Sequence, residues 1–210
     1  DKPKRLDVRQ DALRDLAYYY AEARDPKTAL PFFQNLTVSR QEYKTALEKL
    51  ARRFQIKTMY EESAKVYREL IRVSADVDRN LEWAEAVYEA AVAAKDLAHA
   101  DADVIMLAEV SARFKYWWRA NDEDKKILKD FEMLTRDLST RLHALAKEKG
   151  DPDLYARAAN AYESYLSVFD DSSERLAMEW NYAETLFAAK RFVRSDRQYE
   201  QVLALVGGAP

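Results

Sequence analysis

Apolar and small side chains recur along this chain in one spaced pattern. The pattern begins with an aromatic residue, and a small residue stands three positions after it. A tyrosine follows four positions after the small residue, and two adjacent bulky residues stand three and four positions after the tyrosine. Spacings of three and four residues place all five side chains on one face of a helix. The three clearest copies are Tyr60, Ser63, Tyr67, Leu70 and Ile71; Tyr155, Ala158, Tyr162, Tyr165 and Leu166; and Phe192, Ser195, Tyr199, Val202 and Leu203.

Two looser copies and a preceding segment extend this pattern. The looser copies are Ala29, Phe33 and Leu36, and Leu97, Ala100, Val104 and Leu107. In the segment ahead of four of the five copies a large residue stands beside a small one, and the small residue allows two helices to approach closely. These pairs are Leu16-Ala17, Leu50-Ala51, Leu145-Ala146 and Tyr182-Ala183. The sequence therefore predicts a series of helix hairpins.

Capping signals indicate where helices begin and end. Ser39 with Glu42 reads as a capping box, and Asp171 with Glu174 as a second cap. Asn121 is expected to cap a helix whose first turn is acidic, and residues 150–152 read as C′ glycine, N-cap and first-turn proline. Pro31 is tolerated if its helix begins near Thr28.

One segment departs from the regular spacing. Residues 97–119 and 121–149 contain neither proline nor glycine. Within the second range, apolar residues recur at three and four positions, which predicts one long helix. We therefore expect an elongated central hairpin that projects beyond its neighbours. The apolar positions are Ile127, Leu128, Phe131, Leu134, Leu138, Leu142 and Leu145.

The repeated helix pair resembles the tetratricopeptide repeat, a unit of roughly 34 residues with a large-small pair in its first helix and a small and an aromatic residue in its second. The resemblance implies an all-α, right-handed solenoid of about five hairpins that forms a single superhelical domain over residues 1–210. Tyr88 stands where the third repeat should have a small residue, so that repeat is expected to be distorted. The expected repeats span about 8–38, 39–75, 78–119, 121–170 and 173–206.

Composition agrees with an all-α fold and narrows the possible functions. Three glycines and five prolines are too few for the turns of a sheet with many short strands. No apolar run is long enough to cross a bilayer, so a soluble chain without membrane insertion is expected. Cysteine is absent, which excludes disulfides and thiolate sites. The chain begins at Asp1 rather than Met, which suggests a processed protein or an excised fragment.

The residue types needed for catalysis are sparse. His99 and His143 are the only histidines, and neither belongs to a serine, cysteine or carboxylate arrangement of diagnostic spacing. Phosphate-binding and calcium-binding loops are also missing from the sequence. Basic residues alternate with acids instead of forming one stripe, which argues against nucleic acid. We expect a protein that is not an enzyme and has no cofactor, metal or nucleic-acid partner.

Three features are candidates for recognition of a protein or peptide. The tetratricopeptide resemblance implies a concave groove lined by first helices, although Tyr18, Trp180 and Phe187 could instead pack between repeats. The lysine and asparagine arrangement that clamps a terminal carboxylate in chaperone-binding members is not reproduced. The groove residues are Arg14, Tyr18, Glu48, Arg52, His143, Lys147, Trp180, Glu184 and Phe187.

The other two candidates are an aromatic run and an acidic segment. Residues 115–119 include Trp117 and Trp118 flanked by cations, a mixture enriched at interfaces. Two adjacent tryptophans point about 100° apart on a helix, so at least one should face outward, although tip packing is the alternative. Residues 76–110 carry nine acidic and two basic side chains, which favours either a basic partner or a solvated face.

Taken together, these patterns predict a non-enzymatic scaffold that binds a peptide or a neighbouring subunit in a larger complex. The wording of residues 155–166 and 179–187 resembles cell-envelope tetratricopeptide proteins of Gram-negative bacteria, including those of outer-membrane assembly and of gliding motility in deltaproteobacteria. This resemblance implies a periplasmic location, with the cytoplasm as the alternative. A regulatory or sensor module that binds a signalling peptide, and an accessory domain of a larger enzyme, remain open.

Overall fold

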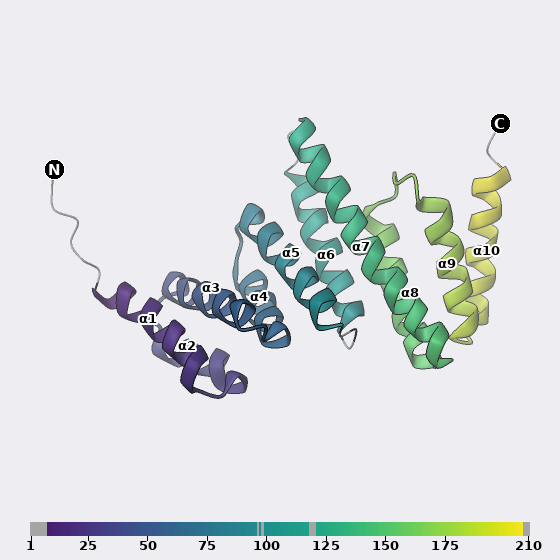
Figure 1. Ribbon diagram of the computed structural model, residues 1–210. Coiled ribbons are helices and arrows are strands. Elements are labelled where there is room, and N and C mark those ends of the chain that lie inside the picture. The colour runs from purple at the N-terminus through teal and green to yellow at the C-terminus, as the bar shows by residue number, and fades with distance from the viewer. Residues whose placement is uncertain (1–7, 96, 98, 118–120, 208–210) are drawn as a thin grey trace. The chain divides into compact units, whose positions relative to one another are not determined.

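The computed structural model describes residues 8–95, 97, 99–117 and 121–207, and every regular element within these ranges is helical (Figure 1). A short 3₁₀ turn, Pro26–Thr28, precedes α2. The helices are α1 Val8–Ala23, α2 Ala29–Leu36, α3 Arg40–Ile56, α4 Tyr60–Val73, α5 Val77–Ala94, α6 Ala100–Tyr116, α7 Asp122–Lys149, α8 Pro152–Val168, α9 Arg175–Ala188 and α10 Phe192–Gly207.

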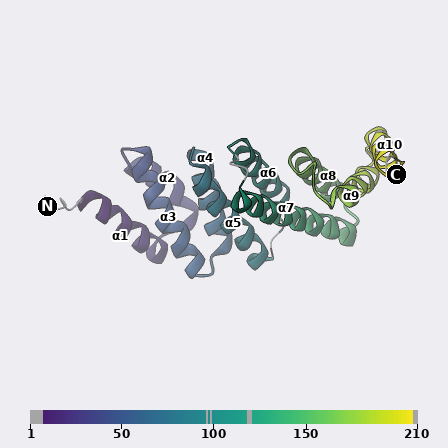
Figure 2. The same ribbon diagram turned by 90° about the horizontal axis from the view of Figure 1, so that it is seen from above.

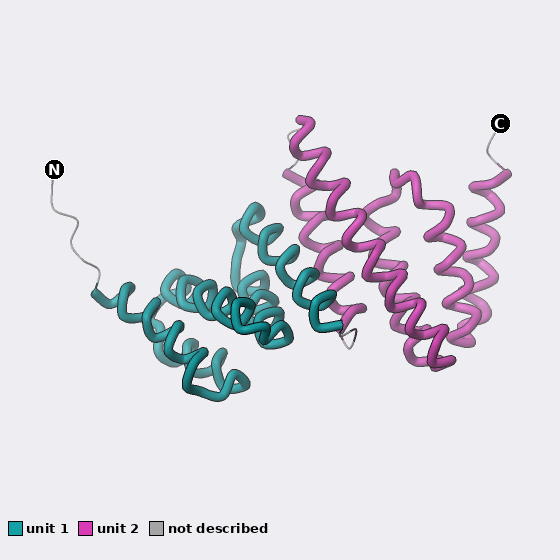
Figure 3. The backbone as a smooth tube through the Cα atoms, in the orientation of Figure 1, with its two compact units in different colours: residues 1–95 teal, residues 96–210 magenta. Residues whose placement is uncertain are grey.

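The helices form two compact units, residues 1–95 and residues 96–210 (Figure 3). In the first unit, α1, α3 and α5 lie on one side, with α2 and α4 on the other (Figure 2). The second unit repeats this arrangement, with α7 and α9 opposite α6, α8 and α10. The all-α solenoid is therefore confirmed. The boundary between units falls inside the expected third repeat, and the single-domain expectation stays a prediction.

Small residues allow the paired helices to approach closely, as the sequence predicts. The alanines of the four large-small pairs are fully buried, so no larger side chain would fit at these positions without moving a helix. In α2, Ala29 and Phe33 are buried as well, whereas Leu36 is 37% exposed. The buried alanines are Ala17, Ala51, Ala146 and Ala183.

Most of the predicted helix ends are present. The Ser39 hydroxyl accepts a hydrogen bond from the Glu42 amide at 3.1 Å, and the Asn121 side chain accepts one from the Asp124 amide at 2.7 Å. Gly150 has a φ of 61° as the C-cap of α7, and α2 begins at Ala29, close to the expected start at Thr28.

The predicted cap at Asp171 is wrong. Helix α9 begins at Arg175, and the Glu174 amide donates to the Ser172 hydroxyl at 3.1 Å. Asp171 is thus too early in the chain to cap α9, and its carboxylate lies 3.6 Å from the Lys115 ammonium.

The long central helix is confirmed, but the long hairpin is not. Helix α7 has 28 residues, whereas α6 has only 17 and ends at Tyr116. Leu97 precedes α6 rather than belonging to it, so its copy of the pattern is helical only from Ala100. Only one helix of the central pair is elongated, and its N-terminal end extends beyond α8 (Figure 1).

The last helix is less buried than its pattern predicts. Tyr67 in α4 is 5% exposed, but the equivalent Tyr199 in α10 is only half-buried. Leu203 in α10 is 70% exposed, whereas its counterpart Ile71 is 6% exposed. The difference arises because α4 packs against both α3 and α5, while in the described part of the chain α10 packs mainly against α9.

Candidate functional site

A polar hollow of about 280 Å³ lies on the first-helix side of the first unit. It is lined by one residue of α1, four of α3 and one of α5, so three successive first helices contribute to it. This is the kind of groove that the repeat pattern predicts. The lining residues are Arg14, Thr45, Glu48, Lys49, Arg52 and Arg79.

Cations dominate this hollow, which we call the cationic hollow. Four of its six lining side chains are positively charged, and Glu48 is the only acid among them. Arg79 lies 2.5 Å from Glu48 and 2.6 Å from Glu82, so Glu48 is already partly neutralised. Arg14 has a longer contact of 3.4 Å with Asp11, and both side chains are about half exposed. Such exposed pairs contribute little and exchange readily for another anion.

The cationic hollow brings together three predicted groove residues and adds three others. Arg14, Glu48 and Arg52 were predicted from their place in the first helices, while Thr45, Lys49 and Arg79 were missed. Thr45 and Lys49 on α3 could have been predicted from spacing, because each lies within one helical turn of a predicted groove residue. Arg79 could not, because it stands on α5, where the repeat pattern is weakest.

Tyr18 is placed on the same helix as Arg14 but does not line the hollow. Its ring is 45% exposed, and the Arg53 guanidinium carbon lies 4.3 Å from the ring centre. Arg53 in turn forms an ion pair with Glu22 at 2.5 Å. Tyr18 therefore joins a cation-π contact between α1 and α3 and keeps part of its ring accessible.

The predicted groove residues of α9 form an exposed row in the second unit. Trp180 and Phe187 are 50% and 57% exposed, and Glu184 lies between them at helical spacing. Tyr199 supports the row, because its ring lies 5.6 Å from that of Trp180 and its hydroxyl donates to the Glu184 carboxylate. This row is available for contact with a partner.

His143 behaves as a packing residue. Its Nδ1 atom lies 3.0 Å from the Tyr162 hydroxyl, and its ring lies 6.0 Å from that of Tyr155. Burial lowers the pKa of His143, and the nearby charge of Lys147 lowers it further. These two effects favour the neutral form of the ring, which lies between helices α7 and α8.

The aromatic run at the end of α6 faces outward where the structure describes it. Trp117 is 68% exposed and Tyr116 is 82% exposed, with their rings 5.4 Å apart in an edge contact. Tip packing is thus excluded for Trp117 within the second unit, while Trp118 lies outside the described residues. Lys115 points to the segment after α8 and donates to the Val168 carbonyl at 3.1 Å.

Several acids of the segment 76–110 have structural roles. Asp76 caps α5, accepting from the Arg79 amide at 3.1 Å. Asp101 pairs with Arg157 at 2.5 Å, and Asp103 is 1% exposed. Some acids of this segment therefore stabilise helices and helix contacts. The segment does not form one free acidic face.

Within its described ranges the chain has neither a metal-binding cluster nor a helix that could cross a bilayer. No cluster of three or more histidine, aspartate or glutamate side chains suited to a metal ion occurs in the described ranges. None of the described helices has the length and apolarity that a bilayer-spanning helix needs.

Comparisons with known proteins identify similar folds. No protein-family model matches the chain, and no curated protein matches it. It is similar to TPR-like repeats of a kinesin light chain from Podosopora anserina, at 15% identity over 93% of this chain and 94% of that one, with a TM-score of 0.36. BtubC (BKLC) from P. vanneervenii is 13% identical over 97% and 93% of the two chains, with a TM-score of 0.27. At these identities the likeness concerns the fold alone.

Proposed function

We propose that this chain is a non-enzymatic scaffold of the tetratricopeptide type that binds an acidic segment of a partner protein in the cationic hollow. The observation that carries this proposal is that four cations from three successive first helices, Arg14, Lys49, Arg52 and Arg79, line one hollow whose lining includes a single acid. Excess positive charge in a concave surface attracts anions and orients them during encounter.

The chemistry of the cationic hollow suits an extended peptide better than a small molecule. Its lining is polar and comes from three helices of the first unit. Small-molecule sites are mostly apolar and enclosed, whereas this surface offers guanidinium groups that bind carboxylates in a bidentate manner. An acidic peptide lying across α1, α3 and α5 would meet a cation from each helix.

A charge-reversal experiment tests this proposal. A fluorescein-labelled peptide of alternating glutamate and glycine is titrated with the wild-type chain and with Arg52→Glu, followed by fluorescence anisotropy. Removing one cation and adding one acid should weaken binding by about tenfold or more, because charge-assisted contacts contribute roughly 1.5–3 kcal/mol each.

Lys65→Glu provides the matched control. Lys65 is an exposed residue of α4, on the second-helix side, and does not line the cationic hollow. Lys65→Glu changes the net charge by the same amount as Arg52→Glu. Equal weakening of peptide binding by both variants would therefore mean that the experiment measures only long-range charge. That outcome, or unchanged binding by Arg52→Glu, would remove the cationic hollow from the proposal.

For the cellular setting we propose a multiprotein assembly of the bacterial cell envelope, with the gliding-motility type as one case and the periplasm as the compartment. What supports this is the wording of the fourth and fifth repeats, which resembles envelope members of the family. Fractionation of cells that express the full-length gene tests it. Recovery in the cytoplasm would favour the regulatory module or the enzyme accessory domain.

A further inference from the structure

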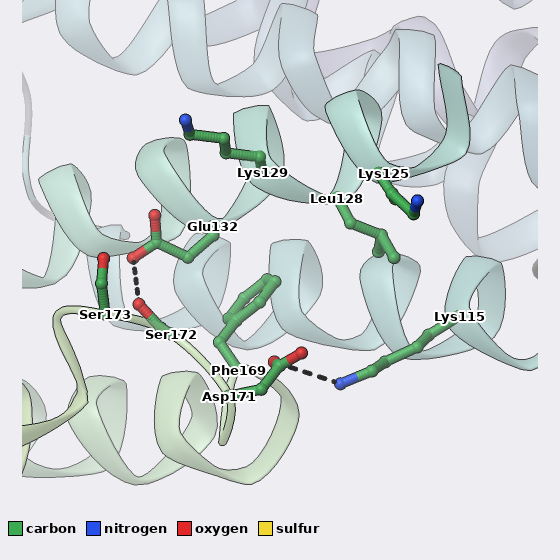
Figure 4. A pocket seen from close by; sticks show the side chains of 9 residues that line it. All are labelled: Lys115, Lys125, Leu128, Lys129, Glu132, Phe169, Asp171, Ser172 and Ser173. Atoms are coloured by element: carbon green, nitrogen blue, oxygen red, sulfur yellow. Dashed lines mark hydrogen bonds and ion pairs between the residues drawn. The ribbon is translucent and has the colours of Figure 1, made fainter. Parts of the chain in front are cut away.

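A second cavity, of about 440 Å³, lies in the second unit and is separate from the predicted groove residues (Figure 4). It is formed by the end of α6, the first turns of α7 and the segment that joins α8 to α9. We call it the α7 pocket. Its lining residues are Lys115, Lys125, Leu128, Lys129, Glu132, Phe169, Asp171, Ser172 and Ser173.

The α7 pocket exists because α7 is longer than the other first helices. Aligning the Ala51 and Ser63 positions with Ala146 and Ala158 places Arg40, the first residue of α3, opposite Thr135. Residues 122–134 of α7 therefore have no counterpart in α3. All four lining residues that α7 contributes lie in this extension.

The floor of the α7 pocket is apolar. Leu128 of α7 and Phe169 both line it, and Phe169, which follows α8, is held by a ring contact of 5.3 Å with Tyr165. Phe169 is only 4% exposed, so its position is fixed by the surrounding helices. An extension that served packing alone would bury its leucine, but Leu128 is half-buried and faces the cavity.

The acids at the α7 pocket already have partners. Glu132 accepts from Arg136 at 2.9 Å, from the Ser172 hydroxyl at 3.2 Å and from the Tyr165 hydroxyl. Asp171 lies 3.6 Å from Lys115. These carboxylates therefore add little repulsion toward an incoming anion.

The lysines at the rim remain accessible. Lys125 pairs with Asp122 at 3.2 Å, but these side chains are 59% and 99% exposed, and such pairs are weak. Lys129 stands one turn further along α7, and its ammonium points away from that of Lys125 (Figure 4). Carboxylates on the two sides of an apolar side chain would thus meet one ammonium group each from the α7 extension.

We propose that the α7 pocket binds a peptide segment of a partner protein in which a bulky apolar side chain is flanked by carboxylates. The apolar side chain would fill the space between Leu128 and Phe169, and the carboxylates would pair with Lys125 and Lys129. The cavity volume lies within the roughly 300–1,000 Å³ typical of binding pockets. This site is in the other unit and does not depend on the cationic hollow.

Three short peptides separate the two parts of this recognition. They are acetyl-Gly-Glu-Phe-Glu-Gly-amide, its lysine-flanked form with Lys in place of both Glu, and its alanine-centred form with Ala in place of Phe. Each is titrated into the ¹⁵N-labelled chain and followed by amide chemical shifts. Shifts centred on residues 125–132 and 169–173 are expected with the first peptide, and shifts about fivefold smaller with the other two.

A variant pair then tests the rim. The double variant Lys125→Glu with Lys129→Glu should weaken binding of the first peptide by about tenfold, because it replaces electrostatic attraction with repulsion. Lys126→Glu is the control, since Lys126 is an exposed neighbour on α7 that does not line the pocket. All three lysines are exposed, so the variants should keep the wild-type amide spectrum elsewhere.

Three outcomes would overturn the proposal. These are equal shifts with the glutamate-flanked and lysine-flanked peptides, equal shifts with the phenylalanine and alanine peptides, and no shifts at the α7 pocket with any peptide. None of these outcomes changes the expected binding of the alternating glutamate-glycine peptide to the cationic hollow. Failure of this proposal is therefore distinguishable from failure of the proposed function.

Discussion

The hydroxyl of Ser63 in α4 donates a hydrogen bond to the Ala51 carbonyl of α3, with 3.0 Å between the two oxygens. Ser195 in α10 makes the same bond to the Ala183 carbonyl of α9, also at 3.0 Å. In both hairpins the two residues are twelve positions apart. The contact is thus a repeated connection between paired helices, placed where the small residue of one helix meets the small residue of the next.

Removing this hydroxyl should cost a modest amount of stability. Ser63→Ala leaves the volume of the site nearly unchanged and deletes one buried hydrogen bond, which contributes about 1 kcal/mol. Chemical denaturation of the variant measures the loss. Ala158, which stands at the same position of α8, shows that alanine is compatible with the fold, so a loss above about 3 kcal/mol would contradict this interpretation.

The two equivalent tyrosines should differ in what their removal costs. Tyr67→Ala deletes an aromatic ring that is 5% exposed and should lower the free energy of unfolding by roughly 3 kcal/mol. Tyr199 is half-buried, so Tyr199→Ala should cost only about 1 kcal/mol. Equal losses, measured by denaturant unfolding, would mean that α10 is covered in solution.

Stability should fall in mild acid because of His143. Its pKa is lowered in the folded protein by burial first and by Lys147 second, so the unfolded chain binds a proton more readily. The stabilisation from the neutral ring is complete above the unfolded pKa of about 6.5 and is lost as the pH falls through and below that value. Urea midpoints at pH 7.5 and 5.5 measure this change.

His143→Gln is the matched variant for the pH experiment. Glutamine does not titrate, so the decrease between the two pH values should become smaller than in the wild type. His99→Gln serves as the control, because His99 is exposed. An identical decrease in the wild type and in His143→Gln would assign the pH dependence to other groups.

Backbone conformation predicts opposite effects at two helix ends. Gly150 and Thr58 both have positive φ, 61° and 58°, a region that favours glycine. Gly150→Ala should therefore cost about 1 kcal/mol, and since no atom lies within 4 Å of the added Cβ, the cost is conformational. Thr58→Gly should stabilise by a similar amount, about 1 kcal/mol. Thermal unfolding of both variants would show shifts of opposite sign.

The sequence predicts the helices well because their buried faces follow helical spacing. The pattern through Ser63 and Tyr67 places α4 correctly, and the apolar positions of 121–149 identify the long α7. The sequence predictions fail where the outcome does not depend on a periodic pattern of apolar residues. The cap predicted at Asp171 depends on where α9 begins, and at Tyr199 burial depends on a neighbouring helix rather than on the helix itself.

Only those residues of the candidate sites that the repeat register marks could be predicted from the sequence. Arg14 and Arg52 follow from the repeat register, which marks the exposed side of each first helix. Arg79 lies on α5, where Tyr88 interrupts the pattern, so its place in the cationic hollow needed the structure. Phe169 lies four residues after Tyr165, so spacing predicts its burial, but no spacing in the sequence relates it to Leu128 of α7.

Site-specific photocrosslinking tests the central claim, that the cationic hollow holds an acidic segment of a partner protein. Benzoylphenylalanine is placed at Thr45, which lines the cationic hollow, or at Lys65, which does not. After irradiation in extract of the source cell, we expect an adduct from position 45 whose cross-linked peptide is rich in Asp and Glu. That adduct should be lost when Arg52→Glu is added. An adduct that persists in the Arg52→Glu background, or that forms only from position 65, would contradict the account.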